Sequence, residues 1–214
     1  MNISVKLLAE YEQADTQRRK EIIERLLKPK SYLKWHDVFR TAVRKFYYEW
    51  GQDSSLASDY FDEQLKKANN ENQRQRVRTS QEAFVLFLEQ KPCLPDGAVL
   101  LPLNEVKGKM YYANLSISVA PDVVFEFFHR GKMVRGGYLF CSSKTHPMEE
   151  EAIKSASYLM WKHLNTTGEA VPKFCCTFDV RAKSQKEAPL NFKRLEARIT
   201  YAASEIGLWV SSST

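Results

Sequence analysis

The spacing of hydrophobic residues changes near residues 91–97. Before that stretch, apolar side chains recur every three or four positions, which is typical of amphipathic helices. Helices are predicted over residues 17–27 and 35–50, from residue 56, and around Val77, Phe84 and Leu88. Residues 68–78 either form a loop or begin the last of these helices. The stretch KPCLPDG at 91–97 has two prolines and a glycine, which interrupt regular structure. We therefore predict a helical region over residues 1–91.

After this break the pattern favours strands. Residues 110–119 alternate between apolar and other side chains, with Leu115, Ile117 and Val119 on one face. A short strand is predicted at 98–103, three longer strands at 110–119, 123–128 and 133–141, a helix at 149–164, a strand at 173–180, a polar loop at 182–189 and a helix at 191–209. The main order is β-β-β-α-β-α, and one mixed sheet flanked by helices accommodates it economically. We therefore predict an α+β domain over residues 98–214.

Glycines mark two special positions in the predicted strands. His129-Arg130-Gly131-Lys132 has the composition of a hairpin loop in which glycine adopts a positive φ. Gly136 and Gly137 interrupt the following strand, which indicates a bulge or a close approach of another part of the chain.

Composition and charge narrow the function only slightly. The net charge is +6 and is spread evenly between the two halves of the chain. Such a charge is compatible with a polyanionic partner, and equally with a basic surface that contacts only solvent. None of the four cysteines forms a CxxC pair, so a structural zinc site is not expected. The first residues lack the apolar core of a signal peptide, and no apolar run reaches 18 residues. We therefore expect a cytoplasmic protein with reduced thiols and no membrane span.

Several residues in the second half follow one another in a suggestive order. Pro121-Asp122 opens one predicted strand, and Ser142-Ser143-Lys144-Thr145 closes the next. Lys154 and Tyr158 follow on the predicted helix, four positions apart. Over residues 110–180, this order and spacing resemble the PD-(D/E)XK nuclease superfamily, in particular its RecB and Cas4-like branch.

The resemblance implies a restriction-endonuclease-like fold and specific roles for three residues. In that family an Asp on the second core strand and an (Asp/Glu)-x-Lys on the third bind a divalent metal and activate water. An active relative would use Asp122, Glu126 or a glutamate of the following helix, and Lys144, with Mg²⁺ as cofactor.

The departures from the family pattern favour binding without cleavage. Ser142 stands where the second metal-binding acid is expected, and a hydroxyl does not replace a carboxylate for Mg²⁺. Lys154 replaces the helical Gln, and Asp122 precedes its strand. The acid could instead come from Glu149–Glu151, although three glutamates at a helix start are also explained by the helix dipole. We therefore predict a degenerate relative with no metal site.

Basic side chains supply the candidate binding residues. Arg130, Lys132 and Arg135 surround the predicted hairpin, and Arg181, Lys183 and Lys186 follow the strand at 173–180. If the two sets lie along one edge of the sheet, they form a groove for a phosphodiester backbone. Otherwise they are solvated loop charges.

Three functions follow from these features. The first is a cytoplasmic protein that binds DNA or RNA without cutting it. The second is a subunit or regulator with a protein partner and no nucleic-acid role, in which Tyr47, Tyr48 and Trp50 form the partner face. The third is a Mg²⁺-dependent nuclease. No pattern in the sequence indicates an oligomeric state.

Overall fold

The structure is a computed structural model of the 214-residue chain, which describes residues 2–27 and 38–211. It confirms the predicted α+β class. Its elements are β1 (Asn2–Ser4), α1 (Val5–Gln13), α2 (Thr16–Leu27), α3 (Val38–Tyr48), α4 (Leu56–Lys67), α5 (Glu71–Gln90), β2 (Val99–Leu100), α6 (Leu103–Val106), β3 (Gly108–Tyr112), β4 (Leu115–Val119), β5 (Val123–His129), β6 (Lys132–Cys141), α7 (Glu150–Leu164), β7 (Ala170–Asp179), β8 (Ser184–Glu187) and α8 (Lys193–Ser211).

The strands of the described residues form two sheets, so the prediction of one mixed sheet is wrong. Sheet A has the order β1-β4-β3, and sheet B has the order β2-β5-β6-β7-β8. In sheet B, β5 and β6 form an antiparallel hairpin, and α7 then connects β6 to the parallel strand β7. The segment predicted as a polar loop at 182–189 contains β8, which pairs with β7 and extends the sheet.

Residues 110–119 form a hairpin, where the alternation predicted one strand. β3 and β4 pair from Gly108–Val119 to Tyr112–Leu115, and two residues form the turn. Ala113 has a φ of 48° in this turn. The turn lacks glycine and proline, and Asn114 is its one residue of a type common in turns. The predicted face of Leu115, Ile117 and Val119 is correct, because all three are buried.

The hairpin predicted at residues 129–132 is confirmed. His129 pairs with Lys132, while Arg130 and Gly131 take positive φ values of 49° and 82°. Two left-handed residues match the turn that suits the twist of adjacent strands.

The interruption of β6 at Gly136 is also confirmed, and it has both predicted causes. The β6–β7 register shifts between Arg135 and Gly137. A Cβ atom at Gly136 would lie 2.6 Å from the Phe125 ring and 2.7 Å from the Phe174 carbonyl oxygen.

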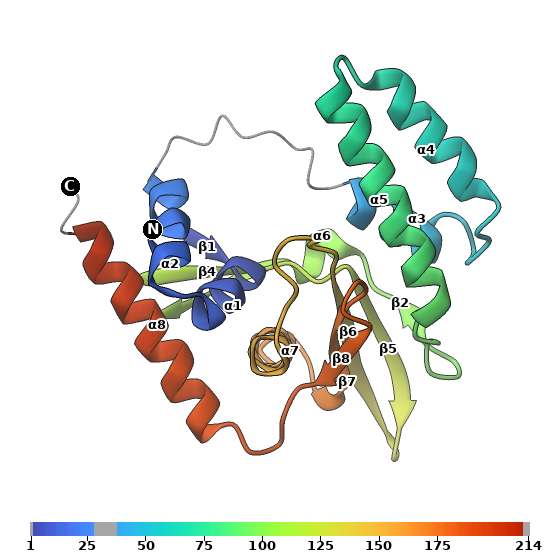
Figure 1. Ribbon diagram of the computed structural model, residues 1–214. Helices are drawn as coiled ribbons and strands as arrows, with labels where there is room; N and C mark the ends of the chain where they lie inside the picture. The colour runs from blue at the N-terminus through green and yellow to red at the C-terminus, as the bar shows by residue number, and fades with distance from the viewer. Residues whose placement is uncertain (1, 28–37, 212–214) are drawn as a thin grey trace.

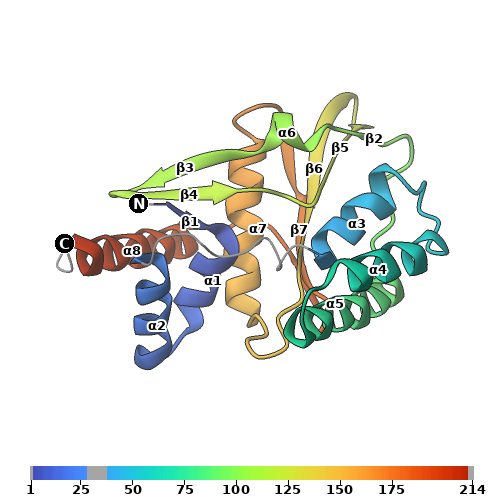
Figure 2. The same cartoon turned by 90° about the horizontal axis from the view of Figure 1, so that it is seen from above.

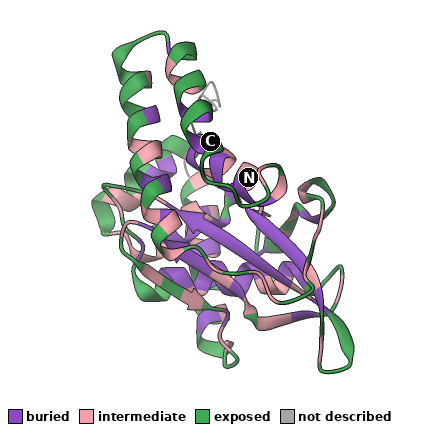
Figure 3. Ribbon diagram, turned by 90° about the vertical axis from the view of Figure 1, so that its right-hand side faces the viewer, coloured by how far each residue is buried: buried purple, intermediate pink, exposed green. Residues whose placement is uncertain are grey.

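Sheet B is covered on both faces by helices. On β5, the alternate residues Val123, Phe125 and Phe127 pack with α3, α4 and α5, whereas Val124 packs on the side of α7. Figures 1 and 2 show α3–α5 on one side of sheet B and α7 on the other, with α1, α8 and sheet A beyond α7. The centre of sheet B is buried, while the projecting ends of α4 and α5 are largely exposed (Figure 3).

The predicted helical region contributes to both faces. Residues 2–27 join the core around α7, because β1 pairs with β4 and α1 packs against α7 and α8. Residues 38–90 cover the other face of sheet B. The helix predicted at 35–50 is present as α3, and the first three residues of that prediction lie outside the described residues. In the part of the chain that the structure describes, no helix has the length and apolar character needed to cross a membrane.

Glu12 is buried where α1 meets α7 and α8. Its side chain is 2% exposed and lies 3.7 Å from Arg198. Neither carboxylate oxygen of Glu12 has a hydrogen-bond donor among the described residues. Burial raises the pKa of Glu12 above its ordinary value of 4.5. Ionisation of Glu12 therefore costs folding free energy as the pH rises through this raised pKa.

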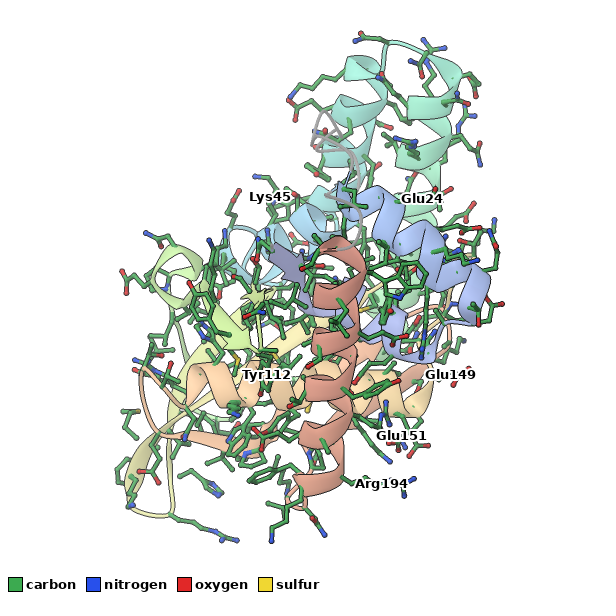
Figure 4. The ribbon with its side chains drawn as sticks, turned by 90° about the vertical axis from the view of Figure 1, so that its left-hand side faces the viewer. Glu24, Lys45, Tyr112, Glu149, Glu151 and Arg194 are labelled. Atoms are coloured by element: carbon green, nitrogen blue, oxygen red, sulfur yellow. The ribbon has the colours of Figure 1, made fainter. Side chains whose placement is uncertain are left out.

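Replacing Glu12 with glutamine is expected to raise the free energy of unfolding at pH 8 by on the order of 1 kcal/mol, because no buried charge remains. Arg198 keeps its closer partner Glu151 at 2.8 Å. Urea denaturation at pH 5 and pH 8 measures the effect, which should be larger at pH 8. The exposed Glu24, labelled on α2 in Figure 4, supplies the control Glu24→Gln. A loss of stability at pH 8 in Glu12→Gln would contradict this account.

Candidate functional site

Asp122 lies at the start of β5 and is completely buried. Its backbone N–H donates to the Tyr138 carbonyl at 2.8 Å, and its Oδ2 accepts from the Phe140 N–H at 2.9 Å. Both contacts join it to the second half of β6. The carboxylate is therefore held at the end of sheet B where β6 and β7 finish.

Three cationic side chains meet this one carboxylate. Arg40 Nε donates to Oδ1 at 2.5 Å, and Arg44 Nη2 lies 3.1 Å from the same oxygen. Lys6 Nζ lies 3.8 Å from Oδ2 and also donates to the Phe140 carbonyl. Arg40 and Arg44 are one turn apart on α3, so they share a helix face, and Lys6 comes from the first turn of α1. We name Lys6, Arg40, Arg44 and Asp122 the Asp122 cluster.

The Asp122 cluster carries more positive than negative charge. Its three cations share the one carboxylate of Asp122, and Arg40 lies nearest to it. Within the described residues, neither Lys6 nor Arg44 has a second carboxylate within ion-pair distance. The side chains of Lys6, Arg40 and Arg44 remain 26%, 22% and 20% exposed, so solvent reaches part of each of them.

Burial and the neighbouring charges shift the pKa values of two members of the cluster. Burial by itself would raise the pKa of Asp122, but Arg40, Lys6 and Arg44 together hold that pKa below its ordinary value. Burial lowers the pKa of Lys6, and the neighbouring Arg40 and Arg44 lower it further. Arg44 Nε is buried and lacks a hydrogen-bond partner among the described residues. An anion bound at the exposed part of the cluster would therefore gain charge compensation.

The structure does not bring the proposed nuclease residues together. Glu126 lies four residues along β5 from Asp122, a separation of about 13 Å, and pairs with Arg135 at 2.6 Å. Lys144 is exposed and lies 4.0 Å from Glu82.

The helix glutamates do not replace the missing acid either. Glu150 contacts Lys154 at 2.8 Å and Lys186 at 3.1 Å, and Glu151 contacts Lys154 and Arg198. Figure 4 shows Glu149 and Glu151 together at the edge of the molecule beside α8.

These residues do not fit a Mg²⁺ site. Both oxygens of Asp122 already face cations or a backbone N–H. Ser142 offers no carboxylate, and its carbonyl accepts from Arg181 Nε at 3.0 Å. Within residues 2–27 and 38–211, no group of three or more His, Cys, Asp or Glu side chains is placed to hold a metal ion.

The two predicted sets of basic residues lie at opposite ends of sheet B. β6 begins at Lys132, beside the hairpin, and its last residue Cys141 pairs with Asp179 at the end of β7. The ten residues of β6 separate these ends by about 30 Å. The condition for a single groove is therefore not met.

Most of these basic side chains already contact a carboxylate. Arg130 lies in the hairpin turn. The others pair as Lys132–Glu169 (3.3 Å), Arg135–Glu126 (2.6 Å), Arg181–Glu82 (3.6 Å), Lys183–Glu89 (3.2 Å) and Lys186–Glu150 (3.1 Å). Arg181 is also fixed by carbonyl groups, because its Nη2 donates to Thr79 O at 2.7 Å. These contacts stabilise loops and give no sign of an open phosphate site.

The aromatic residues proposed as a partner face differ in their burial. Tyr47 is buried, and its hydroxyl donates to the Pro92 carbonyl at 2.8 Å. Tyr48 accepts from the Val124 N–H at 3.0 Å, and Trp50 packs edge-on against Tyr60. Tyr47 is therefore not accessible to a partner, whereas Tyr48 and Trp50 are half-buried and hold α3 against sheet B and α4.

Comparison with known proteins supplies no relative. No protein-family model matches the chain, and no curated protein matches it at a significant level. The chemistry of the Asp122 cluster is therefore inferred from its own geometry.

Proposed function

We propose that the protein binds nucleic acid through the Asp122 cluster and does not cleave it. The observation that carries this proposal is the meeting of three partly exposed cations on one buried carboxylate. Phosphate oxygens are the strongest common acceptors for arginine and lysine, and arginine forks suit them in geometry. The surplus charge of the cluster supports a phosphate ligand.

The absence of cleavage belongs to the same proposal. In the resemblance to PD-(D/E)XK proteins, Asp122 would hold a divalent cation. Here Lys6, Arg40 and Arg44 already surround that carboxylate. The order β5, β6, α7, β7 supports a degenerate fold of that type, because it places Asp122 and the end of β6 side by side.

Fluorescence anisotropy with labelled single- and double-stranded oligonucleotides tests the binding. We expect a Kd in the range of about 10⁻⁴–10⁻⁶ M that weakens steeply from 50 to 200 mM NaCl, since phosphate contacts release counterions. Arg44→Gln should weaken binding about tenfold, because it removes a charge-assisted contact. Lys183→Gln is the matched control, because Lys183 is exposed and pairs with Glu89, away from the cluster.

Two results would contradict the proposal. If Lys183→Gln and Arg44→Gln weaken nucleic-acid binding equally, the Asp122 cluster is not the binding surface. A flat response at low salt would remove the nucleic-acid function and favour the protein-partner alternative. Incubation with Mg²⁺ or Mn²⁺ tests the second half of the proposal, and cleavage that disappears in Lys144→Ala, a change at an exposed side chain, would show an active nuclease.

A further inference from the structure

We infer that the end of the β5–β6 hairpin binds the surface of a lipid bilayer that contains anionic headgroups. We name residues 128–133 the hairpin tip. This surface is separate from the Asp122 cluster, and the inference goes beyond the proposed binding of nucleic acid.

The hairpin tip projects from sheet B. β7 pairs with β6 only from Arg135 onward, and β2 pairs with β5 only at Phe125 and Glu126, so the tip extends past both neighbouring strands. It forms the lower edge of the molecule in Figure 1 and an exposed loop at the lower right of Figure 3. Phe128 lies six residues along the chain from Asp122, a separation of about 20 Å. The tip and the Asp122 cluster are therefore at opposite ends of β5.

Two large apolar side chains are exposed at the hairpin tip. Phe128 and Met133 are directly opposite each other on β5 and β6, so they share one face of the hairpin. Phe128 is 69% exposed and Met133 is 58% exposed. Val99 is 65% exposed and pairs with Glu126, which places it on the same face two residues from Phe128. A contiguous exposed apolar surface of this kind marks a site of interaction with a partner or a membrane.

The hairpin does not need the exposed pair for its own packing. On the opposite face, the Phe174 ring packs edge-on against Phe127 at 4.7 Å and His129 at 5.2 Å between ring centroids. Phe127 is buried among these rings. The tip is therefore supported from one face, while its other face presents apolar side chains to the outside.

Cations surround the apolar pair. Arg130 lies in the turn, Lys132 follows it, and Lys173 adjoins the Phe174 ring that supports the tip. Arg130 and Lys173 are exposed, and neither forms an ion pair with another described residue. Lys132 pairs with Glu169, but both side chains are more than half exposed, so this pair contributes little. The tip therefore combines an apolar surface with a positive charge.

This charge disfavours a second copy of the chain as the partner. A symmetric contact between two hairpin tips would bring Arg130 and Lys132 of one copy close to the same residues of the other, and like charges repel. A surface cavity of about 400 Å³ between α3 and α4 is lined mainly by polar side chains such as Lys45 and Gln64, so it does not suit an apolar tip.

An anionic bilayer accommodates both features of the tip. Its negative surface potential attracts lysine and arginine side chains, and its acyl chains accept apolar side chains next to the headgroups. A projecting tip reaches such a surface without a preformed cavity. Because the apolar surface is small, we expect reversible binding that needs both the apolar and the cationic side chains.

Sedimentation with vesicles tests the inference on the 214-residue chain. The vesicles contain phosphatidylcholine alone, or phosphatidylcholine with phosphatidylserine. We expect binding to the anionic vesicles that weakens with salt, and little binding to the neutral ones. Phe128→Gln should weaken binding about tenfold, the order expected when a large apolar side chain no longer enters the bilayer. Lys132→Gln should weaken it about fivefold, because one cation near the surface is lost.

Tyr201→Gln is the matched control. Tyr201 is an aromatic residue of similar exposure, 68%, on α8, which lies on the far side of α7 from the hairpin (Figure 1). This variant should bind anionic vesicles as the wild-type protein does. Circular dichroism verifies that each variant is folded, and Phe128→Gln should bind oligonucleotides with unchanged affinity.

Three results would overturn the inference. Absence of vesicle binding at low salt would do so and would leave the proposed function in place. Equal binding of anionic vesicles by Phe128→Gln and the wild-type protein would show attraction by charge alone, without the hairpin tip. Without vesicle binding, self-association or oligonucleotide binding that Phe128→Gln removes would identify a second copy or a nucleic acid as the occupant of the tip.

Discussion

Replacing Asp122 with alanine is expected to lower the free energy of unfolding by about 3–5 kcal/mol, the range for removal of one partner from a buried ion pair. Asp122 is completely buried, and Lys6 and Arg44 share its carboxylate with Arg40. Alanine would leave these cations beside an apolar side chain. It would also remove the acceptor for the Phe140 N–H.

Urea denaturation at pH 7 measures this loss, with Asp62→Ala as the control. Asp62 is exposed on α4, and its replacement should change stability by no more than about 0.5 kcal/mol. Because the pKa of Asp122 is lowered on folding, its contribution is present above its ordinary value of 3.8 and disappears as the pH falls through the folded pKa. A loss below about 1 kcal/mol at pH 7 would show that Asp122 does not organise the cluster.

Gly136→Ala is expected to cost about 3 kcal/mol, at the upper end of the range for overpacking a core. The new Cβ atom would lie 2.6 Å from the Phe125 ring and 2.7 Å from the Phe174 carbonyl oxygen. The carbonyl belongs to the backbone of β7 and cannot rotate away as a flexible side chain would.

Gly207→Ala is the matched control for the same substitution. Gly207 lies inside α8, and a Cβ atom there would meet nothing within 4 Å. Alanine should stabilise this helix by up to about 1 kcal/mol, since it is the better helix former. Thermal denaturation of both variants compares them directly, and an unchanged midpoint for Gly136→Ala would contradict the close approach at β6.

The sequence predicted the elements better than their assembly. Local signals located α7 and the β5–β6 hairpin, because an amphipathic stripe and a glycine turn each act within a few residues. The division into two sheets depends on β1, which pairs with β4 more than a hundred residues later. β1 has only three residues, which is too short for an alternation of apolar and polar side chains to predict its partner strand. The β3–β4 turn was missed because it uses Ala113 in place of glycine.

The candidate site was predicted only in part. The sequence predicted Asp122 as a site residue because it directly precedes an apolar strand. Arg40 and Arg44 are four residues apart on α3, but nothing local in the sequence connects them with Asp122. Lys6 carried no signal, because its contact with Asp122 depends on the packing of α1 beside β6. The resemblance to metal-dependent nucleases drew attention to Glu126 and Lys144, which pair elsewhere.

The salt dependence of nucleic-acid binding tests the central claim about the Asp122 cluster most directly. The observed association constant for nucleic acid falls with salt, and the slope of its logarithm against the logarithm of the salt concentration reports how many phosphates the protein neutralises. We predict a clear negative slope for the wild-type protein, and a slope smaller in magnitude by about one unit for Arg44→Gln, with Lys183→Gln unchanged. An identical slope in Arg44→Gln and the wild-type protein would contradict the claim that this cluster binds phosphate.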